Sequence, residues 1–134
     1  MSRGAPCQAG LMQLLRIVPD LPSANPERTA HFYMELLDMK LAMSHGWIAT
    51  LTGAEDSAIQ LSLIDRDVTA PVSPAVSIEV ADVDAVHANA VRLGLDVVYP
   101  LTDEAWGVRR FFVEDPDGNV VNVLQHQPVR GRSA

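Results

Sequence analysis

The order strand, helix, strand, strand, strand occurs twice along this chain of 134 residues, and this repeat limits its fold more than any other feature. The second copy is the clearer one, because residues 75–80 alternate apolar and polar side chains as a half-buried strand does. Asp82 is a suitable N-cap for a helix to Leu93, and Gly94 suits the left-handed residue after it. Three β-rich runs follow, at 96–101, 108–114 and 120–124.

The first copy begins with a predicted strand over residues 14–21. Asn25-Pro26-Glu27 then supplies an N-cap, a proline at the first helical position and a first-turn acid for a helix to about Leu37. Asp38 stands where the second copy has glycine, and aspartate tolerates the left-handed conformation there less well than glycine does. The next predicted strands are 40–44, 47–51 and 58–64.

These two copies predict an α+β fold made of two tandem βαβββ modules. We expect a single domain over residues 14–125, with module one at 14–66 and module two at 74–125. Flexible tails are expected at 1–13 and 126–134. The alternative is an ordinary α+β domain whose halves match by chance.

The composition argues against two classes of partner. The net charge is −7 and the pI about 4.8, with no offsetting cluster of Lys and Arg, so nucleic acid is not an expected partner. The apolar runs are shorter than the ~18 residues of a membrane span, and the N-terminus lacks the apolar segment of a secretory signal. The only cysteine, Cys7, lies in the N-terminal tail, so no intramolecular disulfide is expected and the cytoplasm is the predicted compartment.

Short motifs in both copies carry a family resemblance. They are VPDLP at 18–22, NPER at 25–28, HFY at 31–33, IEVADVD at 78–84 and, after Trp106-Gly107 and an aromatic strand, DPDGN at 115–119. In these motifs the chain resembles the vicinal oxygen chelate superfamily, which includes glyoxalase I, bleomycin-resistance proteins and extradiol dioxygenases. The likeness covers about residues 14–125. It implies a cup-shaped, largely antiparallel eight-stranded sheet with helices on the outside, and a homodimer with a pocket in or near the cup.

Metal-using members of that superfamily hold a divalent ion inside the cup, with ligands from the opening and closing strands of each module. The resemblance places these positions at Val18 and Ala75 on the opening strands and at Gln60 and Asn122 on the closing strands. A divalent cation needs side chains such as His and Glu, and this set offers only two uncharged amides. We therefore expect no metal ligands and no cofactor, as in the metal-free bleomycin-resistance-like members.

The histidines show no metal-binding spacing. His31 and His87 fall on the predicted helices, and His126 falls past the last predicted strand. His45, at the end of a strand, is the one histidine expected near the pocket. A structural role for His45 is the alternative.

Alternation along the strands indicates which side chains line the cup. Leu15, Ile17 and Leu21 are apolar and are expected to face the helix. The opposite parity then faces the cup, and it comprises Leu14, Arg16, Val18, Asp20, Gln60, Ser62, Ala75, Ser77, Glu79 and Asn122. Buried charges need partners, so this pattern predicts an ion pair from Arg16 to Glu79 or Asp20. Ligand binding by the same residues is supported equally.

Trp47 and Trp106 occupy equivalent places, each beside a glycine at the start of the third strand of its module. Both are candidate aromatic walls for a planar ligand at the cup mouth. The alternative is that they seal a core or a dimer seam. Parity with Phe111 favours Arg110 over Arg109 as the arginine that faces the cup.

Three functions remain open on the sequence. The leading prediction is a metal-free protein that binds a small organic molecule through Arg16, His45, Trp47, Gln60, Trp106, Arg110 and Asn122. The second is an enzyme: a lyase, isomerase or dioxygenase with a metal at a non-standard site, or a metal-free acid–base catalyst with Glu79 as base and a pKa raised by burial, a rise that an Arg16 partner would oppose. The third is an interaction module whose polar cup is closed by a dimer partner. The sequence names no ligand, and it leaves open whether the modules pair within one chain or swap between two.

Overall fold

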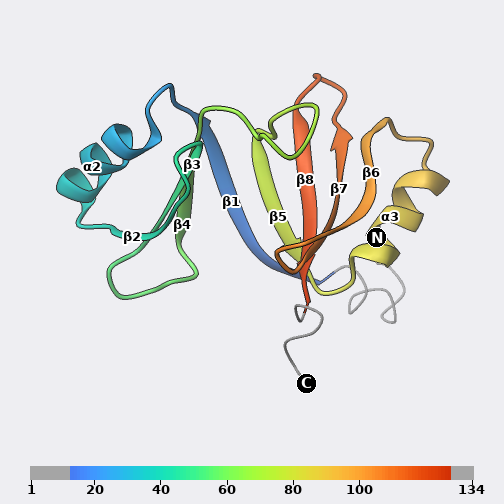
Figure 1. Cartoon of the computed structure of the whole chain (residues 1–134). Helices are drawn as coiled ribbons and strands as arrows, with labels where there is room; N and C mark the ends of the chain where they lie inside the picture. The colour runs from blue at the N-terminus through green and yellow to red at the C-terminus, as the bar shows by residue number, and fades with distance from the viewer. Residues whose placement is uncertain (1–12, 128–134) are drawn as a thin grey trace. The chain divides into compact units, whose positions relative to one another are not determined.

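The computed structural model describes residues 13–127, and Figure 1 shows the path of the chain through its elements. Cys7 and most of the predicted tails lie outside the described residues. The described part has eight strands and two helices, in the order strand, helix and three strands, twice. The prediction of an α+β fold from two βαβββ modules is confirmed. The elements are β1 (Leu14–Pro22), α2 (Pro26–Leu37), β2 (Lys40–Ser44), β3 (Ile48–Thr52), β4 (Gln60–Ile64), β5 (Val76–Val80), α3 (Val83–Arg92), β6 (Val97–Glu104), β7 (Val108–Glu114) and β8 (Val120–His126).

Both helices begin at the predicted capping residues. The Asn25 side chain accepts a hydrogen bond from the Arg28 N–H at 3.1 Å, and Asp82 accepts one from the Ala85 N–H at 3.2 Å. After α2, Asp38 adopts the left-handed conformation with φ 60°, as its position predicts. Neither helix in the described residues is long and apolar enough to cross a membrane.

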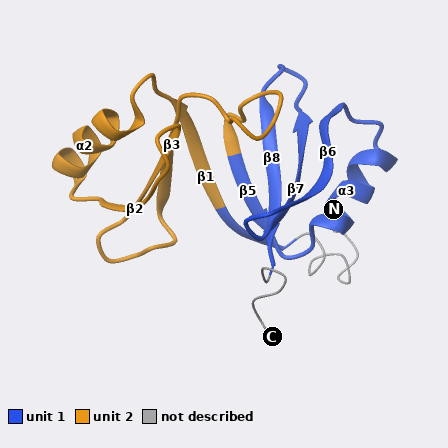
Figure 2. Ribbon diagram, in the orientation of Figure 1, with its two compact units in different colours: residues 1–16, 77–134 blue, residues 17–76 orange. Residues whose placement is uncertain are grey.

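Residues 17–76 form one compact unit, which Figure 2 draws in orange and which we call the first unit. Its strands follow the order β2-β3-β4-β1, with antiparallel β2–β3 and β3–β4 pairs and a parallel β4–β1 pair. α2 packs mainly on β3. The buried residues of this core are Ala30, Ala49, Leu51 and Leu63.

The other compact unit, blue in Figure 2, comprises residues 13–16 and 77–127 of the described chain, and we call it the second unit. Its strands follow the order β5-β8-β7-β6, and β7 is antiparallel to both of its neighbours. α3 lies on one face of these strands. The buried residues of this core are Val80, Val83, Ala90, Phe111 and Val123.

Two strands of the second unit are longer than the sequence predicts. β6 continues to Glu104 and β8 to His126, because both residues pair with Val108 at the start of β7. His126 therefore lies in a strand, and its prediction as a residue past the last strand is wrong. In the first unit β4 is shorter than predicted and begins at Gln60.

β1 alternates as expected, but the burial of its two sides differs from the prediction. Leu15 and Ile17 are 50% and 54% exposed, and Leu21 is also exposed, whereas Asp20 on the opposite side is buried. The expectation that the three apolar side chains pack beneath a helix is wrong for this chain. Within the first unit, which holds Ile17 and Leu21, α2 packs mainly on β3.

Candidate functional site

The strands of the second unit turn one face toward α3 and the other away from it. Ile78, Val80, Phe111, Val121 and Val123 pack into the core with α3. Because successive residues of a strand point to opposite faces, their neighbours lie on the other side. We call this other side the polar face, and it carries Ser77, Glu79, Arg110, Asn122 and His126.

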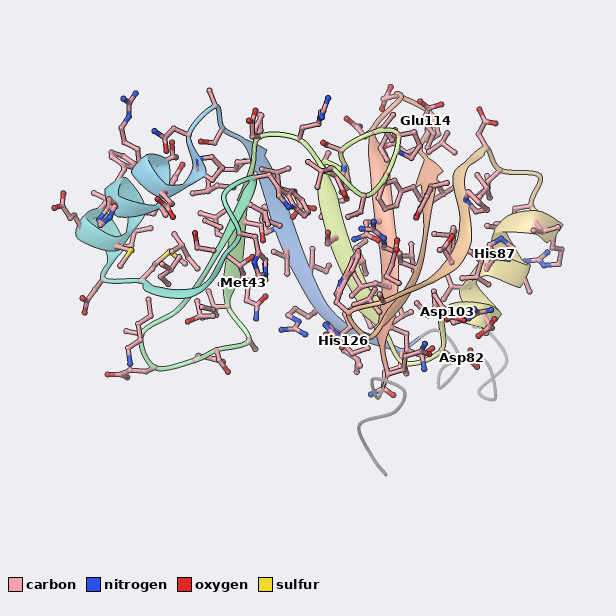
Figure 3. All side chains as sticks on the ribbon, in the orientation of Figure 1. Met43, Asp82, His87, Asp103, Glu114 and His126 are labelled. Atoms are coloured by element: carbon pink, nitrogen blue, oxygen red, sulfur yellow. The ribbon has the colours of Figure 1, made fainter. Side chains whose placement is uncertain are left out.

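Glu79 is the centre of a charged cluster on the polar face. Its Oε1 accepts a hydrogen bond from Arg16 Nε at 2.9 Å, and Arg16 Nη2 donates to the same oxygen. Its Oε2 lies 2.9 Å from His126 Nδ1, and Figure 3 labels His126 at the end of β8. The predicted ion pair between Arg16 and Glu79 is therefore confirmed, and His126 is an addition that the sequence did not predict.

These contacts decide the charge of Glu79. Burial raises the pKa of the Glu79 carboxyl, but hydrogen bonds from His126 and Arg16, together with their positive charges, lower it by more. The net pKa lies below its ordinary value, so the prediction of a base with a raised pKa is wrong. An ionised carboxylate of this kind accepts hydrogen bonds and fixes the orientation of its two partners.

Arg110 is the centre of a second, more deeply buried cluster. Its Nε donates to Glu104 Oε2 at 2.8 Å, and the two side chains are only 6% and 10% exposed. The Tyr99 hydroxyl donates to the same oxygen at 2.8 Å. The guanidinium carbon lies 4.9 Å from the centre of the Phe112 ring and 5.3 Å from those of Tyr99 and Trp106. Such contacts contribute about 0.5–2 kcal/mol each, so this arginine is held by both charge and aromatic contact.

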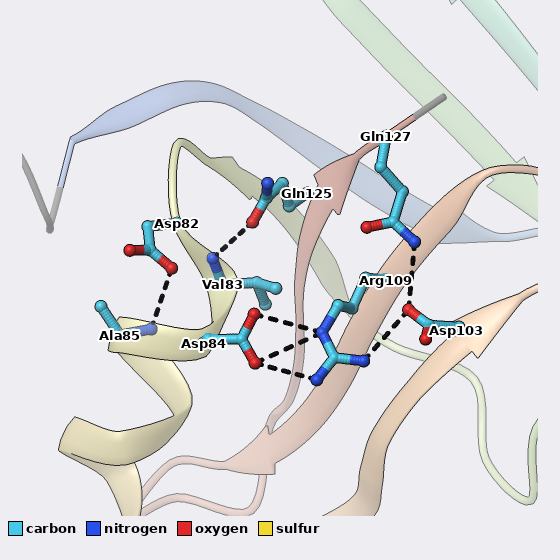
Figure 4. Close-up of polar contacts among 8 residues, drawn as sticks. All are labelled: Asp82, Val83, Asp84, Ala85, Asp103, Arg109, Gln125 and Gln127. Carbon is cyan, nitrogen blue, oxygen red and sulfur yellow. Dashed lines mark hydrogen bonds and ion pairs between the residues drawn. The ribbon is translucent and has the colours of Figure 1, made fainter. Parts of the chain in front are cut away.

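The neighbouring Arg109 lies on the opposite side of β7 by strand alternation, and Figure 4 shows it directed toward Asp84 of α3. Its guanidinium bonds both carboxylate oxygens of Asp84 in the first turn of α3, with Nη2 at 2.8 Å from Oδ1. Nη1 donates to Asp103 at 3.0 Å, and Gln127 Nε2 donates to the same carboxylate oxygen. Hydrogen bonds from Arg109 lower the pKa of Asp84, and those to Asp84 and Asp103 raise the pKa of Arg109. This network joins α3 to β7 on the helix side, and it agrees with the parity argument that turns Arg110 away from the helix.

Asn122 lies on the polar face and is buried. Its Nδ2 donates to the Ser77 hydroxyl at 3.0 Å. Its Oδ1 is buried and has no hydrogen-bond partner among the described residues. A buried acceptor without a partner costs about 1–3 kcal/mol.

Three predicted site residues, His45, Trp47 and Gln60, belong to the first unit, and their hydrogen bonds are local. His45 is exposed, and its backbone N–H donates within the β2–β3 turn at 2.8 Å. The Trp47 carbonyl accepts from the Asp65 N–H at 2.9 Å, and its side chain is half-buried. Gln60 Nε2 donates to the Ser57 carbonyl at 3.0 Å. The structure brings the other five predicted residues, Arg16, Glu79, Trp106, Arg110 and Asn122, into the second unit.

The side chains at the four positions where the resemblance places metal ligands form a poor ligand set. Val18 and Ala75 have no ligand atoms, Gln60 is engaged locally, and Asn122 offers one neutral oxygen. Among residues 13–127 no group of three or more His, Cys, Asp or Glu side chains is arranged to hold a metal ion.

Sequence reasoning missed three members of the polar clusters, Tyr99, Glu104 and His126. His126 has the same parity as Asn122, so extending the alternation of the last strand by two residues would have placed it on the polar face. Glu104 and Tyr99 had no comparable signal. β6 shifts register twice against β7, between Val97 and Tyr99 and again before Thr102, and such shifts break simple alternation.

A family model described as the Glyoxalase/Bleomycin resistance protein/Dioxygenase superfamily matches residues 13–123. The search of curated proteins finds no match. Among solved structures, a member of the same superfamily from Vibrio splendidus has 17% identity and a TM-score of 0.64, covering 84% of this chain and 99% of that one.

Two named enzymes have folds of the same kind. A methylmalonyl-CoA epimerase from Streptomyces coelicolor, in complex with 2-nitronate-propionyl-CoA, has 17% identity and a TM-score of 0.64, covering 86% of this chain and 98% of that one. A variant of homoprotocatechuate 2,3-dioxygenase from Brevibacterium fuscum has 20% identity and a TM-score of 0.64, covering 90% of this chain and 35% of that one. At these identities the likeness shows the fold alone.

Proposed function

The chain belongs to the glyoxalase/bleomycin resistance protein/dioxygenase superfamily, and from this membership we propose that it binds a small organic molecule at the polar face without a catalytic metal. The observation that carries the proposal is Trp106. Its side chain is 49% exposed, yet its ring centre lies 5.3 Å from the guanidinium of the buried Arg110. An aromatic wall that is both held in place and accessible is what stacking of a planar ligand requires.

Polar groups on the same face support the proposal. Ligand sites combine an apolar or aromatic surface with a few fixed polar groups that orient the ligand. The Arg16–Glu79–His126 cluster supplies such groups, which are fixed by their mutual hydrogen bonds and partly exposed. Arg110 is 5% exposed and bonded to Glu104, so in this proposal it supports Trp106 rather than contacting the ligand.

The metal-free part of the proposal rests on the donor set. Two of the superfamily's four ligand positions hold Val18 and Ala75, which cannot bind a cation. The epimerase named above was solved with a CoA derivative, so organic ligands are compatible with the fold. Ligand binding by this chain then depends on stacking and hydrogen bonds, which need no metal.

Intrinsic tryptophan fluorescence tests the proposal, because the chain has two tryptophans. Planar aromatic compounds are titrated into chelator-treated protein and into the Trp106→Phe and Trp47→Phe variants. We expect a saturable fluorescence change in wild type and in Trp47→Phe that is absent in Trp106→Phe. A panel that changes neither the fluorescence nor the melting temperature of the wild type would contradict the proposal.

The metal content of untagged protein tests the metal-free part separately. We expect metal far below one ion per chain, with no uptake when Ni, Zn, Fe or Mn is added. Near-stoichiometric metal would overturn this part and favour a metal-dependent lyase, isomerase or dioxygenase with a non-standard site. Gln60, Asn122 and His45 would then be the first ligands to substitute.

A further inference from the structure

His126 has a defined proton position, which follows from its partner. Its Nδ1 lies 2.9 Å from Glu79 Oε2, and the other oxygen of that carboxylate is bonded to Arg16. Because an ionised carboxylate only accepts hydrogen bonds, Nδ1 carries the proton. In the neutral imidazole the remaining nitrogen, Nε2, is then a proton acceptor.

The imidazole lies at the end of the polar face where Trp106 stands. His126 on β8 is directly opposite Val108 on β7, two residues after Trp106. The Gln127 N–H donates to the Gly107 carbonyl at 3.0 Å. This hydrogen bond holds the end of β8 beside Gly107, the residue that follows Trp106. The His126 side chain is 55% exposed, so this end of the face is open to a ligand.

We infer that His126 is the proton acceptor of the polar face and that the site selects planar ligands with a weakly acidic hydroxyl group. The inference rests on the proposed function, since it names the ligand class of that same face. Glu79 acts through His126 as a positioning residue, and Arg16 keeps Glu79 in its ionised form.

The proton transfer needs no further reactant. The O–H bond of the ligand breaks, its electron pair stays on the ligand oxygen, and the proton forms an N–H bond at His126 Nε2. The resulting imidazolium lies between the ligand anion and the Glu79 carboxylate, so charge separates but total charge does not change. The charged groups that face His126 in this cluster are Glu79 and, through it, Arg16.

4-Nitrophenol and 4-nitroanisole form a matched pair of probes, because they share the planar ring and differ in the acidic proton. Only the nitrophenol anion absorbs strongly in the visible range, so its spectrum reports the ionisation of the bound probe. We expect wild type to bind 4-nitrophenol as the anion and about tenfold more tightly than 4-nitroanisole, the lower end of the range for charged hydrogen bonds because His126 is half exposed.

The His126→Gln variant should bind both probes equally, whereas His31→Gln, at an exposed histidine of α2, should behave as wild type. Equal binding of both probes by wild type would overturn the inference and leave the proposed function standing. Binding of neither probe would also overturn it, and the fluorescence panel with other compounds would then decide the proposed function by itself.

The tautomer of His126 gives a second readout that needs no ligand. Long-range ¹H–¹⁵N NMR correlations should show the proton on Nδ1 and a bare Nε2 in the neutral ring. Glu79→Gln should weaken this preference and reduce the discrimination between the two probes, while the fold, followed by circular dichroism, is retained. A neutral His126 with its proton on Nε2 in wild type would contradict the inference.

Discussion

Removal of Glu104 is the sharpest test of the structure, because this carboxylate lies against a buried cation. The side chains of Arg110 and Glu104 are 6% and 10% exposed, and Arg110 Nε lies 2.8 Å from Glu104 Oε2. Removing one partner of a buried ion pair costs about 3–5 kcal/mol, since the other charge loses that partner without returning to water. The three rings around the guanidinium remain, so we take the lower end for this term.

The Tyr99 hydroxyl adds a smaller contribution, because it also donates to Glu104. Loss of that acceptor costs about 1 kcal/mol, which gives about 4 kcal/mol in total for Glu104→Ala. With a urea m-value of about 2 kcal/mol/M, the unfolding midpoint should fall by about 2 M. Urea unfolding followed by circular dichroism measures this shift.

Two further variants separate burial from charge. Asp84→Ala removes a carboxylate from the exposed Arg109 network, where the loss should stay below about 1 kcal/mol. Replacing both Arg110 and Glu104 by methionine should leave the stability within about 1 kcal/mol of wild type, because apolar residues of similar size remove both desolvation penalties. A Glu104→Ala protein no less stable than Asp84→Ala would refute the reasoning.

The remaining predictions concern other parts of the chain. Because the pKa of Glu79 is lowered on folding, its ion pairs stabilise the protein above the ordinary value of 4.5, and this contribution is lost as pH falls through the lower, folded-state value. Acid titration should therefore show wild type losing its stability advantage over Glu79→Gln below that pH, and an advantage that grows on acidification would contradict it. Asp82→Ala should lose about 1 kcal/mol in urea unfolding and Asp82→Asn much less, because only alanine removes the N-cap acceptor. Ile17→Lys should convert the predicted homodimer to a monomer in light scattering, because exposed apolar side chains of β1 are candidates for its interface, and a monomeric wild type would show the homodimer prediction to be wrong.

Local signals in the sequence were sufficient for the fold, because each helix begins and ends at residues whose chemistry acts within a few positions. Asn25 and Asp82 accept hydrogen bonds from N–H groups three residues on, and Asp38 adopts its left-handed conformation within its own turn. Alternation likewise identified the face that carries Arg16 and Glu79. These features depend only on residues that are close together along the chain, so they can be predicted from a single sequence.

Features that depend on packing between distant elements were not accessible in the same way. Ile17 and Leu21 have the pattern of a buried strand side, yet their exposure depends on where α2 packs in the first unit, which no residue of β1 determines. The partner of Arg110 is at Glu104 because β6 shifts register against β7 and extends past its predicted end. Burial of Glu79 was expected to raise its pKa. The direction of the net shift depends on how many donors reach the carboxylate, and the hydrogen bond from His126, which the sequence did not predict, helps to lower the pKa.

The two charged clusters of the polar face differ in burial, and this difference separates their roles. The guanidinium of Arg110 is enclosed by aromatic rings and a carboxylate. A substitution there is therefore expected to lower the free energy of unfolding more than it changes ligand binding. His126 is half exposed and keeps one nitrogen free of the Glu79 contact, so its replacement removes little packing. A variant series should therefore divide cleanly: substitutions at Arg110 and Glu104 lower stability, while His126→Gln changes ligand discrimination at nearly constant stability. Loss of both properties together at His126 would mean that its role is structural, and the division by burial would fail.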